Sequence, residues 1–205
     1  MYFSKDIVKD ILVTSSHRPS RRVRSFINDL VGTIARARKI NRGKKSLEDL
    51  VEIMILEGYR ILIVVNTWKA NPGRMDIYRR VDKNLVKIGY IVIRSIKLSR
   101  EQRVSICSIM FPKIVSDKCL STTCEAVKEI LKAILEIEGN QEGVKVEDGI
   151  VHMEDGDDMI YIWFSRNGEK CGPRIAIRSA VRLYKENSQS VNRDSRGGEG
   201  IESYM

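Results

Sequence analysis

Apolar positions at the start of the chain predict a strand followed by a helix. The strand is expected over Ile7–Ser16, where a short apolar core ends in polar turn residues. In the next segment apolar residues recur at spacings of three and four, the pattern of one buried helix face, and Pro19-Ser20 suits the first turn or the cap. This stripe consists of Val23, Phe26, Ile27, Leu30, Ile34 and Ala37.

A second helix and a buried strand complete the first unit. The helix is expected to begin near Ser46, because Ser46 and Asp49 have the spacing of a capping box, and to end at Gly58. The uninterrupted apolar run Ile61–Val65 predicts a strand covered on both faces. The order in this part of the chain is therefore strand, helix, helix, strand.

Turn residues separate the strands expected in the middle of the chain. Asn71-Pro72-Gly73 predicts a turn before a strand over Met75–Arg80, and a longer strand is expected over Leu85–Leu98. The apolar segment Val104–Met110 then opens the second half of the chain.

The second half repeats this order of elements loosely. A helix is expected to start at Thr122, with Glu125 as its capping-box partner, and to end at Gly139. The strands expected after this helix are Gly149–Glu154, Met159–Ser165 and Arg174–Tyr184, with Asp155-Gly156 as a hairpin turn between the first two.

Two short motifs echo each other in the two halves. Asn71-Pro72-Gly73-Arg74 and Cys171-Gly172-Pro173-Arg174 each precede an expected strand. The pattern indicates an old duplication of a mixed α/β unit, and α/β is the fold class that we predict.

Length and composition favour a single globular domain. The chain has 205 residues, of which 42% are apolar and 31% charged, enough for a core that needs neither disulfides nor a structural metal. We find no apolar run that would span a bilayer and no signal-peptide pattern, so we expect a cytoplasmic protein with no membrane partner. The domain is expected over residues 7–186, in halves 7–98 and 99–186, followed by a disordered tail over 187–205.

The cysteines and histidines do not suggest a metal site. The four cysteines include no CxxC pair, and only His17 and His152 are present to join them around a metal. We therefore expect four reduced thiols, no metal and no cofactor. The cysteines are Cys107, Cys119, Cys124 and Cys171.

Charge is distributed unevenly along the chain. The formal net charge is +9, and the segment from Thr14 to Lys45 alone holds ten basic residues and one acidic residue. The segment from Glu125 to Asp158 instead holds eleven acidic and three basic residues. One part of the molecule is therefore expected to attract polyanions and another to repel them.

The junction between the first strand and the first helix is the strongest candidate for anion binding. Four arginines surround this helix start: Arg18, Arg21, Arg22 and Arg24. A helix N-terminus carries partial positive charge and free N–H groups, so cations are misplaced there unless an anion is bound. The N–H groups, hydroxyls and guanidinium groups would together hold a phosphate. The alternative is that these arginines pair with the acidic second half, and the two interpretations can coexist.

The last expected strand is a second basic candidate. Strict alternation places Arg174, Arg178 and Arg182 on one face, a stripe that can follow a phosphate backbone. Most aromatic residues are expected in the core, whereas Trp68 is expected in a loop and is the main stacking candidate. The aromatic residues considered are Trp68, Tyr78, Tyr90, Tyr161 and Trp163.

No recognisable catalytic apparatus is present in the sequence. We find no P-loop, dinucleotide-binding glycine pattern or nucleophile elbow, which argues against an enzyme and a small-molecule substrate. A nuclease that uses His17 and His152 as acid and base remains an alternative. The acidic residues around Asp155 are expected to form a solvated turn and not a cation site.

Several of these segments together resemble the Brix domain of ribosome-biogenesis proteins. They are the strand-turn-helix segment Val13–Phe26, Asn41-Arg42-Gly43, the turn from Asn66 to Arg74, and Gly172-Pro173-Arg174 before an alternating strand. The resemblance covers about Lys9 to Lys185 and is strongest to short archaeal members, which are similar to the eukaryotic factor that acts on small-subunit pre-rRNA. Trp68-Lys69-Ala70 stands where many relatives have an Arg-Gly pair.

The resemblance implies two similar α/β halves, each like the anticodon-binding domain of class IIa aminoacyl-tRNA synthetases. It also implies a non-enzymatic role in rRNA processing and small-subunit assembly, with rRNA or pre-rRNA and other assembly proteins as partners. The predicted RNA-binding residues are Ser16, His17, Arg18, Ser20, Arg21, Arg22, Arg24, Arg42, Lys44, Lys45, Arg74, Arg174 and Arg178. A protein-only assembly scaffold is the remaining alternative.

Overall fold

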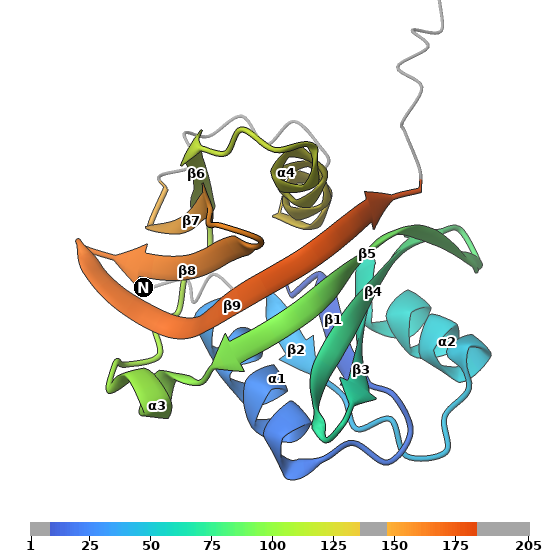
Figure 1. Ribbon diagram of the computed structural model, residues 1–205. Coiled ribbons are helices and arrows are strands. Elements are labelled where there is room, and N and C mark those ends of the chain that lie inside the picture. The colour runs from blue at the N-terminus through green and yellow to red at the C-terminus, as the bar shows by residue number, and fades with distance from the viewer. Residues whose placement is uncertain (1–8, 136–146, 184–205) are drawn as a thin grey trace, which may run out of the picture.

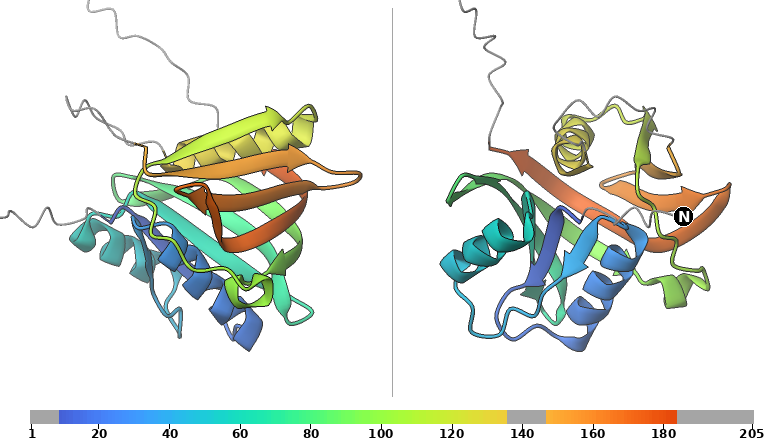
Figure 2. Two further views of the ribbon diagram at one scale, coloured as in Figure 1. Left: turned by 90° about the vertical axis from the view of Figure 1, so that its left-hand side faces the viewer. Right: turned by 180° about the vertical axis from the view of Figure 1, so that it is seen from behind.

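The computed structural model describes residues 9–135 and 147–183, which form one mixed sheet with helices packed against it (Figure 1). Along the chain the elements are β1 (Ile11–Ser15), α1 (Arg21–Thr33), β2 (Ala37–Lys39), α2 (Leu47–Glu57), β3 (Ile61–Trp68), β4 (Asn71–Val81), β5 (Asn84–Lys97), α3 (Ser99–Gln102), β6 (Pro112–Lys118), α4 (Thr122–Leu135), β7 (Gly149–Asp155), β8 (Ile160–Arg166) and β9 (Glu169–Arg182). The nine strands lie in the order β2-β1-β3-β4-β5-β9-β8-β7-β6, and the sheet is strongly twisted (Figure 2).

The two halves of the sheet have the same order of strand pairings. In the first half β1 is parallel to β3, and β3, β4 and β5 are antiparallel neighbours. In the second half β6 is parallel to β7, and β7, β8 and β9 are antiparallel neighbours. The antiparallel pair of β5 and β9 joins the halves. The α/β class is confirmed, while the duplication stays a prediction.

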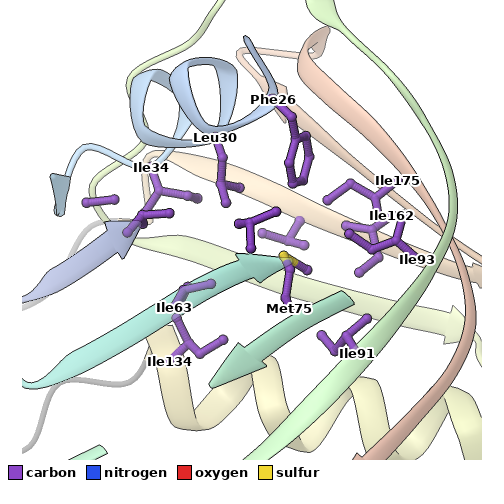
Figure 3. Close-up of a cluster of buried hydrophobic side chains, with 14 of the residues drawn as sticks. Phe26, Leu30, Ile34, Ile63, Met75, Ile91, Ile93, Ile134, Ile162 and Ile175 are labelled. Atoms are coloured by element: carbon purple, nitrogen blue, oxygen red, sulfur yellow. The ribbon is translucent and has the colours of Figure 1, made fainter. Parts of the chain in front are cut away.

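One continuous core joins the halves. We call the sheet face that carries Ile61, Ile63 and Val65 the inner face; its side chains pack with those of α1 and α4 (Figure 3). A small cavity of about 60 Å³ remains in this core and is lined only by apolar residues of both halves. On the outer face, Leu62 and Val64 pack against α2, so β3 is covered on both sides as predicted.

Helix capping in the first half follows the sequence closely. Ser20 caps α1, since its Oγ accepts a hydrogen bond from the Val23 N–H at 3.1 Å. Ser46 and Asp49 form the predicted capping box of α2, and Gly58 ends this helix with a φ of 78°. Local motifs were sufficient here because each partner lies within one helical turn.

The end of α1 differs from the prediction of a helix that continues to Ala37. The helix stops at Thr33, and the next residues pair with another part of the chain: Ala35 N–H donates to the Ile109 carbonyl at 2.8 Å. Ala37 belongs instead to β2, which lies parallel to β1. The order from β1 to β3 is therefore βαβαβ, because a long-range contact overrides the helical spacing.

The predicted turn at Asn71-Pro72-Gly73 is wrong. These residues begin β4, and the turn is made by Lys69 and Ala70, both with positive φ. Gly73 is required for another reason: a Cβ there would lie 2.3 Å from the Cβ of Trp68. Gly172 has a similar role, since a Cβ would lie 2.4 Å from Thr33 Oγ1 where β9 crosses α1.

In the second half, the helix start at Thr122 is confirmed, and the hairpin is confirmed with strand ends shifted by one residue. The cap of α4 is Ser121, whose Oγ accepts from the Cys124 N–H, whereas Glu125 forms an ion pair with Lys128. The apolar segment 104–110 is not a strand; the strand before α4 is β6. Strand β9 begins five residues before the predicted Arg174. The predicted cap at Gly139, the ends at Ile7 and Tyr184, and the tail over 187–205 lie outside the described residues.

All four cysteines are paired, which corrects the prediction of reduced thiols. The disulfides are Cys107–Cys171 and Cys119–Cys124, with Cα–Cα distances of 5.6 and 5.5 Å. The first joins positions 64 residues apart, where the segment after α3 meets the start of β9. Sequence spacing cannot reveal such a pairing, because the fold brings the two residues within bonding range.

A buried ion network fastens the first half to the end of α4. Asp10 accepts hydrogen bonds from Arg36 (Nε to Oδ1, 2.9 Å) and from Arg60. The same two arginines donate to carbonyl oxygens of the last turn of α4, Arg36 to Leu135 and Arg60 to Ala133. Both cations therefore lie at the negative end of a helix.

Within residues 9–135 and 147–183, no helix is long and apolar enough to cross a bilayer.

Candidate nucleic-acid interface

The junction between β1 and α1 brings most of the predicted basic residues onto one surface. We call it the junction patch, and its members are Ser16, His17, Arg18, Ser20, Arg21, Arg24, Arg42, Lys44 and Lys45. Ser16 continues the pairing of β1 with β3, since its N–H donates to the Val65 carbonyl at 2.9 Å. The patch therefore lies at the edge of the sheet where parallel strands β1 and β3 end.

Hydrogen bonds tie two loops to this junction. The Nδ1 atom of His17 lies 3.0 Å from the carbonyl oxygen of Gly43, to which it donates, and this contact holds the loop of Arg42, Lys44 and Lys45 against the junction. The Ser20 hydroxyl donates to the Ala70 carbonyl at 2.6 Å, which attaches the β3–β4 turn. His17 and Ser20 thus organise the patch, a role that the sequence does not show.

Three arginines of the patch are exposed without an acidic partner. Arg18, Arg21 and Arg24 form no ion pair with a carboxylate in the described parts of the chain. The first turn of α1 also contains no acidic residue. The helix start and these guanidinium groups are therefore positive together, as an anion-binding surface requires.

Arg42 is unusual because it is buried without a complete set of partners. Its exposed fraction is 8%, and its Nε and Nη1 atoms have no hydrogen-bond partner among the described residues. A buried guanidinium group with free donors is costly unless something accepts them. This makes Arg42 the member of the patch with the strongest unmet demand for an acceptor.

Arg22 does not belong to the patch, which corrects the prediction for this residue. Its guanidinium group holds both carboxylate oxygens of Glu101, with Nη2 at 2.9 Å from Oε2, and also donates to the Ile96 carbonyl. The hydrogen bond from Arg22 lowers the pKa of Glu101. Glu101 lies in the second half of the chain, although outside the segment Glu125–Asp158, so Arg22 forms the internal pairing that was the alternative interpretation.

The arginines of β4 and β9 are spread over the outer face. Arg74 pairs with Asp76 at 3.0 Å, Arg174 lies over the ring of Tyr161 at 4.2 Å, and Arg178 is exposed. Arg74 faces Val92 of β5, whereas Arg174 faces Lys97 at a different level of the sheet. Arg74 and Arg178 line one groove of the outer face, whereas Arg174 lies apart from it.

The predicted single stripe along β9 is wrong because a β-bulge interrupts the alternation. The pairing with β5 shifts between Val92 and Ile93. Arg182 consequently points toward α4, where it pairs with Glu129 at 2.8 Å. Strict alternation cannot hold across a bulge, since the extra residue changes the face of all later side chains.

The aromatic residues are less buried than expected. Trp68 is 69% exposed at the end of β3. Tyr161 and Trp163 alternate along β8 with buried residues of the inner face, so they lie half-buried on the outer face. Tyr90 and Tyr78 are half-buried as well, each within reach of Lys87. The prediction that most of these rings lie in the core is wrong.

The two histidines have separate surroundings. His17 contacts the loop at Gly43, whereas His152 is stacked on Trp163 and bonded to Ser165. Burial and the nearby Lys170 lower the pKa of His152. A shared acid-base site of the two histidines is therefore not formed.

The acidic turn after β7 has a capping function. Asp155 accepts hydrogen bonds from the N–H groups of Leu120 and Ser121, just before α4. Burial alone would raise the pKa of Asp155, but the hydrogen bonds from Ser121 and Leu120 outweigh it and lower this pKa. Asp155 is therefore committed to the helix start.

Comparisons with known proteins place this fold in a family, although no protein-family model matches the chain. Over 91 residues the chain is 40% identical to a probable Brix domain-containing ribosomal biogenesis protein of Thermococcus kodakarensis. It is 32% identical over 123 residues to the protein of the same description from Saccharolobus solfataricus, and this match covers 59% of the chain and 69% of that protein. The chain belongs to the Brix domain-containing family.

The structural comparison agrees with this assignment and covers more of the chain. The crystal structure of a probable ribosomal biogenesis protein from Aeropyrum pernix K1 is similar with a TM-score of 0.71 and 26% identity, over 85% of this chain and 98% of that chain. The sequence match to the Thermococcus Brix protein spans only 44% of each chain. The predicted family is therefore confirmed.

Proposed function

We propose that this Brix protein is a ribosome-biogenesis factor that binds rRNA through the junction patch. The observation that carries the proposal is the set of exposed arginines at the start of α1, none paired with a carboxylate of the described residues. The names of its relatives support a role in ribosome biogenesis, and the charge of the patch supports contact with RNA.

The patch suits a phosphate backbone better than a single small anion. Arg18, Arg21 and Arg24 are exposed at the helix start, and the loop held by His17 adds Lys44, Lys45 and the buried Arg42 with its free donors. Several separated cations can each neutralise one phosphate, which gives affinity and orientation without reading bases. Ser16 and Ser20 contribute by shaping the junction.

The proposed role is non-enzymatic and lies in rRNA processing and small-subunit assembly in the cytoplasm. Pre-rRNA is the main partner, and other assembly proteins are further partners. The repeated order of strand pairings supports an origin by duplication of a unit like the anticodon-binding domain of class IIa aminoacyl-tRNA synthetases.

The test is a binding measurement with a charge-reversed patch. Arg21→Glu with Arg24→Glu is compared with the wild type and with Lys83→Glu plus Lys118→Glu, which changes the net charge equally at exposed sites in the β4–β5 turn and in β6. Each protein is titrated with a small-subunit rRNA precursor and with random RNA of equal length, from low to physiological salt.

We expect the patch variant to lose at least tenfold in affinity for the precursor, and the control to lose much less. The wild-type affinity should fall with salt by roughly 0.7–0.9 log units per phosphate contact and favour the precursor. Equal losses in both variants would reject the patch as the binding site. No binding to either RNA by the wild type would favour the protein-only scaffold.

A further inference from the structure

A groove on the outer face lies between the β3–β4 hairpin and strands β5 and β9, which run side by side (Figure 1). Its volume is about 410 Å³. Polar, aromatic and basic side chains predominate around it: the lining residues used below are Asn66, Trp68, Gly73, Arg74, Arg94 and Arg178. We call it the Trp68 groove.

The turn that carries Trp68 is held in place, and the ring of Trp68 is exposed. Lys69 and Ala70 adopt left-handed backbone conformations directly after Trp68. Position 73 must be glycine, because the Cβ of Trp68 occupies the space that a side chain there would need. The Ser20 hydroxyl fixes the turn through the Ala70 carbonyl. A large exposed aromatic ring on a turn anchored in this way suits a flat partner, because the backbone loses little conformational freedom on binding.

The basic side chains of the groove exceed its acidic ones. Arg94 and Arg178 are exposed and form no ion pair with a carboxylate in residues 9–135 and 147–183. Arg74 is paired with Asp76, which also binds Asn66 and Lys87 and is therefore already neutralised. An aromatic plane thus stands beside two guanidinium groups without acidic partners.

We propose that the Trp68 groove binds one nucleotide of single-stranded RNA. The base stacks on Trp68, and Arg94 and Arg178 bind the flanking phosphates. This inference rests on the proposed function and adds a preference: the patch holds backbone of any strand, whereas the groove accepts only a base that is free of its duplex.

The chemistry of the groove favours RNA over an acidic peptide. Carboxylates would satisfy the arginines but leave the exposed face of Trp68 without a partner, whereas a nucleotide satisfies both. Stacking is tolerant of base identity, so the groove selects strandedness more than sequence. The Ser20–Ala70 hydrogen bond places the groove next to the junction patch, so that one RNA strand can reach both.

The test uses the fluorescence of Trp68 in the full chain. The chain has two tryptophans, so Trp163→Phe leaves Trp68 as the only indole. A single-stranded pentanucleotide, a duplex of equal length and a glutamate-rich peptide are titrated into this variant. We expect quenching by the single strand alone.

Affinity measurements then use substitutions in the groove. We expect Trp68→Ala to weaken single-strand binding about tenfold, the typical effect of losing one stacked base, with little change for duplex RNA. Trp68→Phe should restore most of the affinity. Leu56→Ala is the matched control, since Leu56 is an exposed apolar residue on α2.

The outcomes separate this proposal from the proposed function. Quenching of Trp68 by the single strand that persists in the Arg21→Glu, Arg24→Glu variant supports the groove, even when this variant no longer binds the precursor. The groove alone is overturned if precursor binding depends on the patch, RNA does not quench Trp68, and Trp68→Ala has the same affinity for the single strand as Leu56→Ala. Absence of both signals overturns both proposals, and stronger quenching by the peptide than by RNA overturns the nucleotide as ligand.

Discussion

Arginines at the two ends of different helices have opposite environments in this protein. At the C-terminal end of α4, the buried Arg36 and the half-buried Arg60 share Asp10 and donate to helix carbonyls. At the N-terminal end of α1, Arg21 and Arg24 are exposed without an acidic partner among the described residues. The first group is satisfied by the protein, whereas the second lacks such partners and is the group that we propose to contact RNA.

The comparison shows why a count of basic residues overstates a binding surface. Arg36 lies in the same basic segment as Arg21 and Arg24, yet it is only 2% exposed. Arg22 is one residue from Arg21 and is used to hold Glu101. A cation stabilises the C-terminal end of a helix and destabilises its N-terminal end, so position relative to the helix separates Arg36 from Arg21 and Arg24. Arg22 differs from Arg21 and Arg24 by its ion pair with Glu101.

The largest effect is expected from removing the shared carboxylate of the buried group. Asp10→Ala removes the carboxylate that Arg36 and Arg60 share, and we expect the free energy of unfolding to fall by about 3–5 kcal/mol. Urea unfolding measures this change. Asp117→Ala, at an exposed position of β6, is the control and should change stability by less than about 0.5 kcal/mol. Equal effects of the two substitutions would show that the network is unimportant.

Neutralising the exposed group should have effects of opposite sign on binding and stability. For Arg21→Gln with Arg24→Gln we expect the salt dependence of RNA binding to weaken by roughly 0.7–0.9 log units per lost contact. Stability should rise by up to about 1 kcal/mol per residue, because each cation is misplaced at the helix start. Arg36→Gln should instead lower stability. A loss of stability in the Arg21→Gln, Arg24→Gln variant would contradict the proposed difference between arginines at the two helix ends.

The smallest change in stability is expected from the ion pair of Arg22, which lies at the start of α1 but has an acidic partner. Because the hydrogen bond from Arg22 lowers the pKa of Glu101 in the folded protein, the ion pair stabilises the fold above the unfolded pKa of this carboxyl, about 4.3. This contribution is lost as the pH falls through the lower, folded pKa. Glu101→Gln should therefore be less stable than the wild type at neutral pH, with a difference that closes in acid. Unfolding curves from pH 7 to pH 3 test this, and a constant difference would argue against it.

The elements with local signals were predictable. The caps of α1 and α2, the buried run in β3, the hairpin after β7 and the family motifs all depend on residues close in sequence. The junction patch was predicted in the same way, because a helix start among arginines is visible in the sequence. Two local signals failed, the turn at Asn71-Pro72-Gly73 and the capping partner Glu125. The other failures were longer in range: the end of α1, strand β6, the bulge in β9 and the pairing of Cys107 with Cys171.

The sequence by itself determined the secondary structure signals, the family and the concentration of positive charge at one junction. Only the tertiary structure decided which of those charges remain available. Arg36 finds its partners 26 and 99 residues away, Arg22 finds Glu101 79 residues away, and the Trp68 groove draws on β3, β4, β5 and β9. Capping depends on neighbours within one helical turn, whereas the partner of a long cationic side chain depends on which distant backbone the folded sheet places beside it.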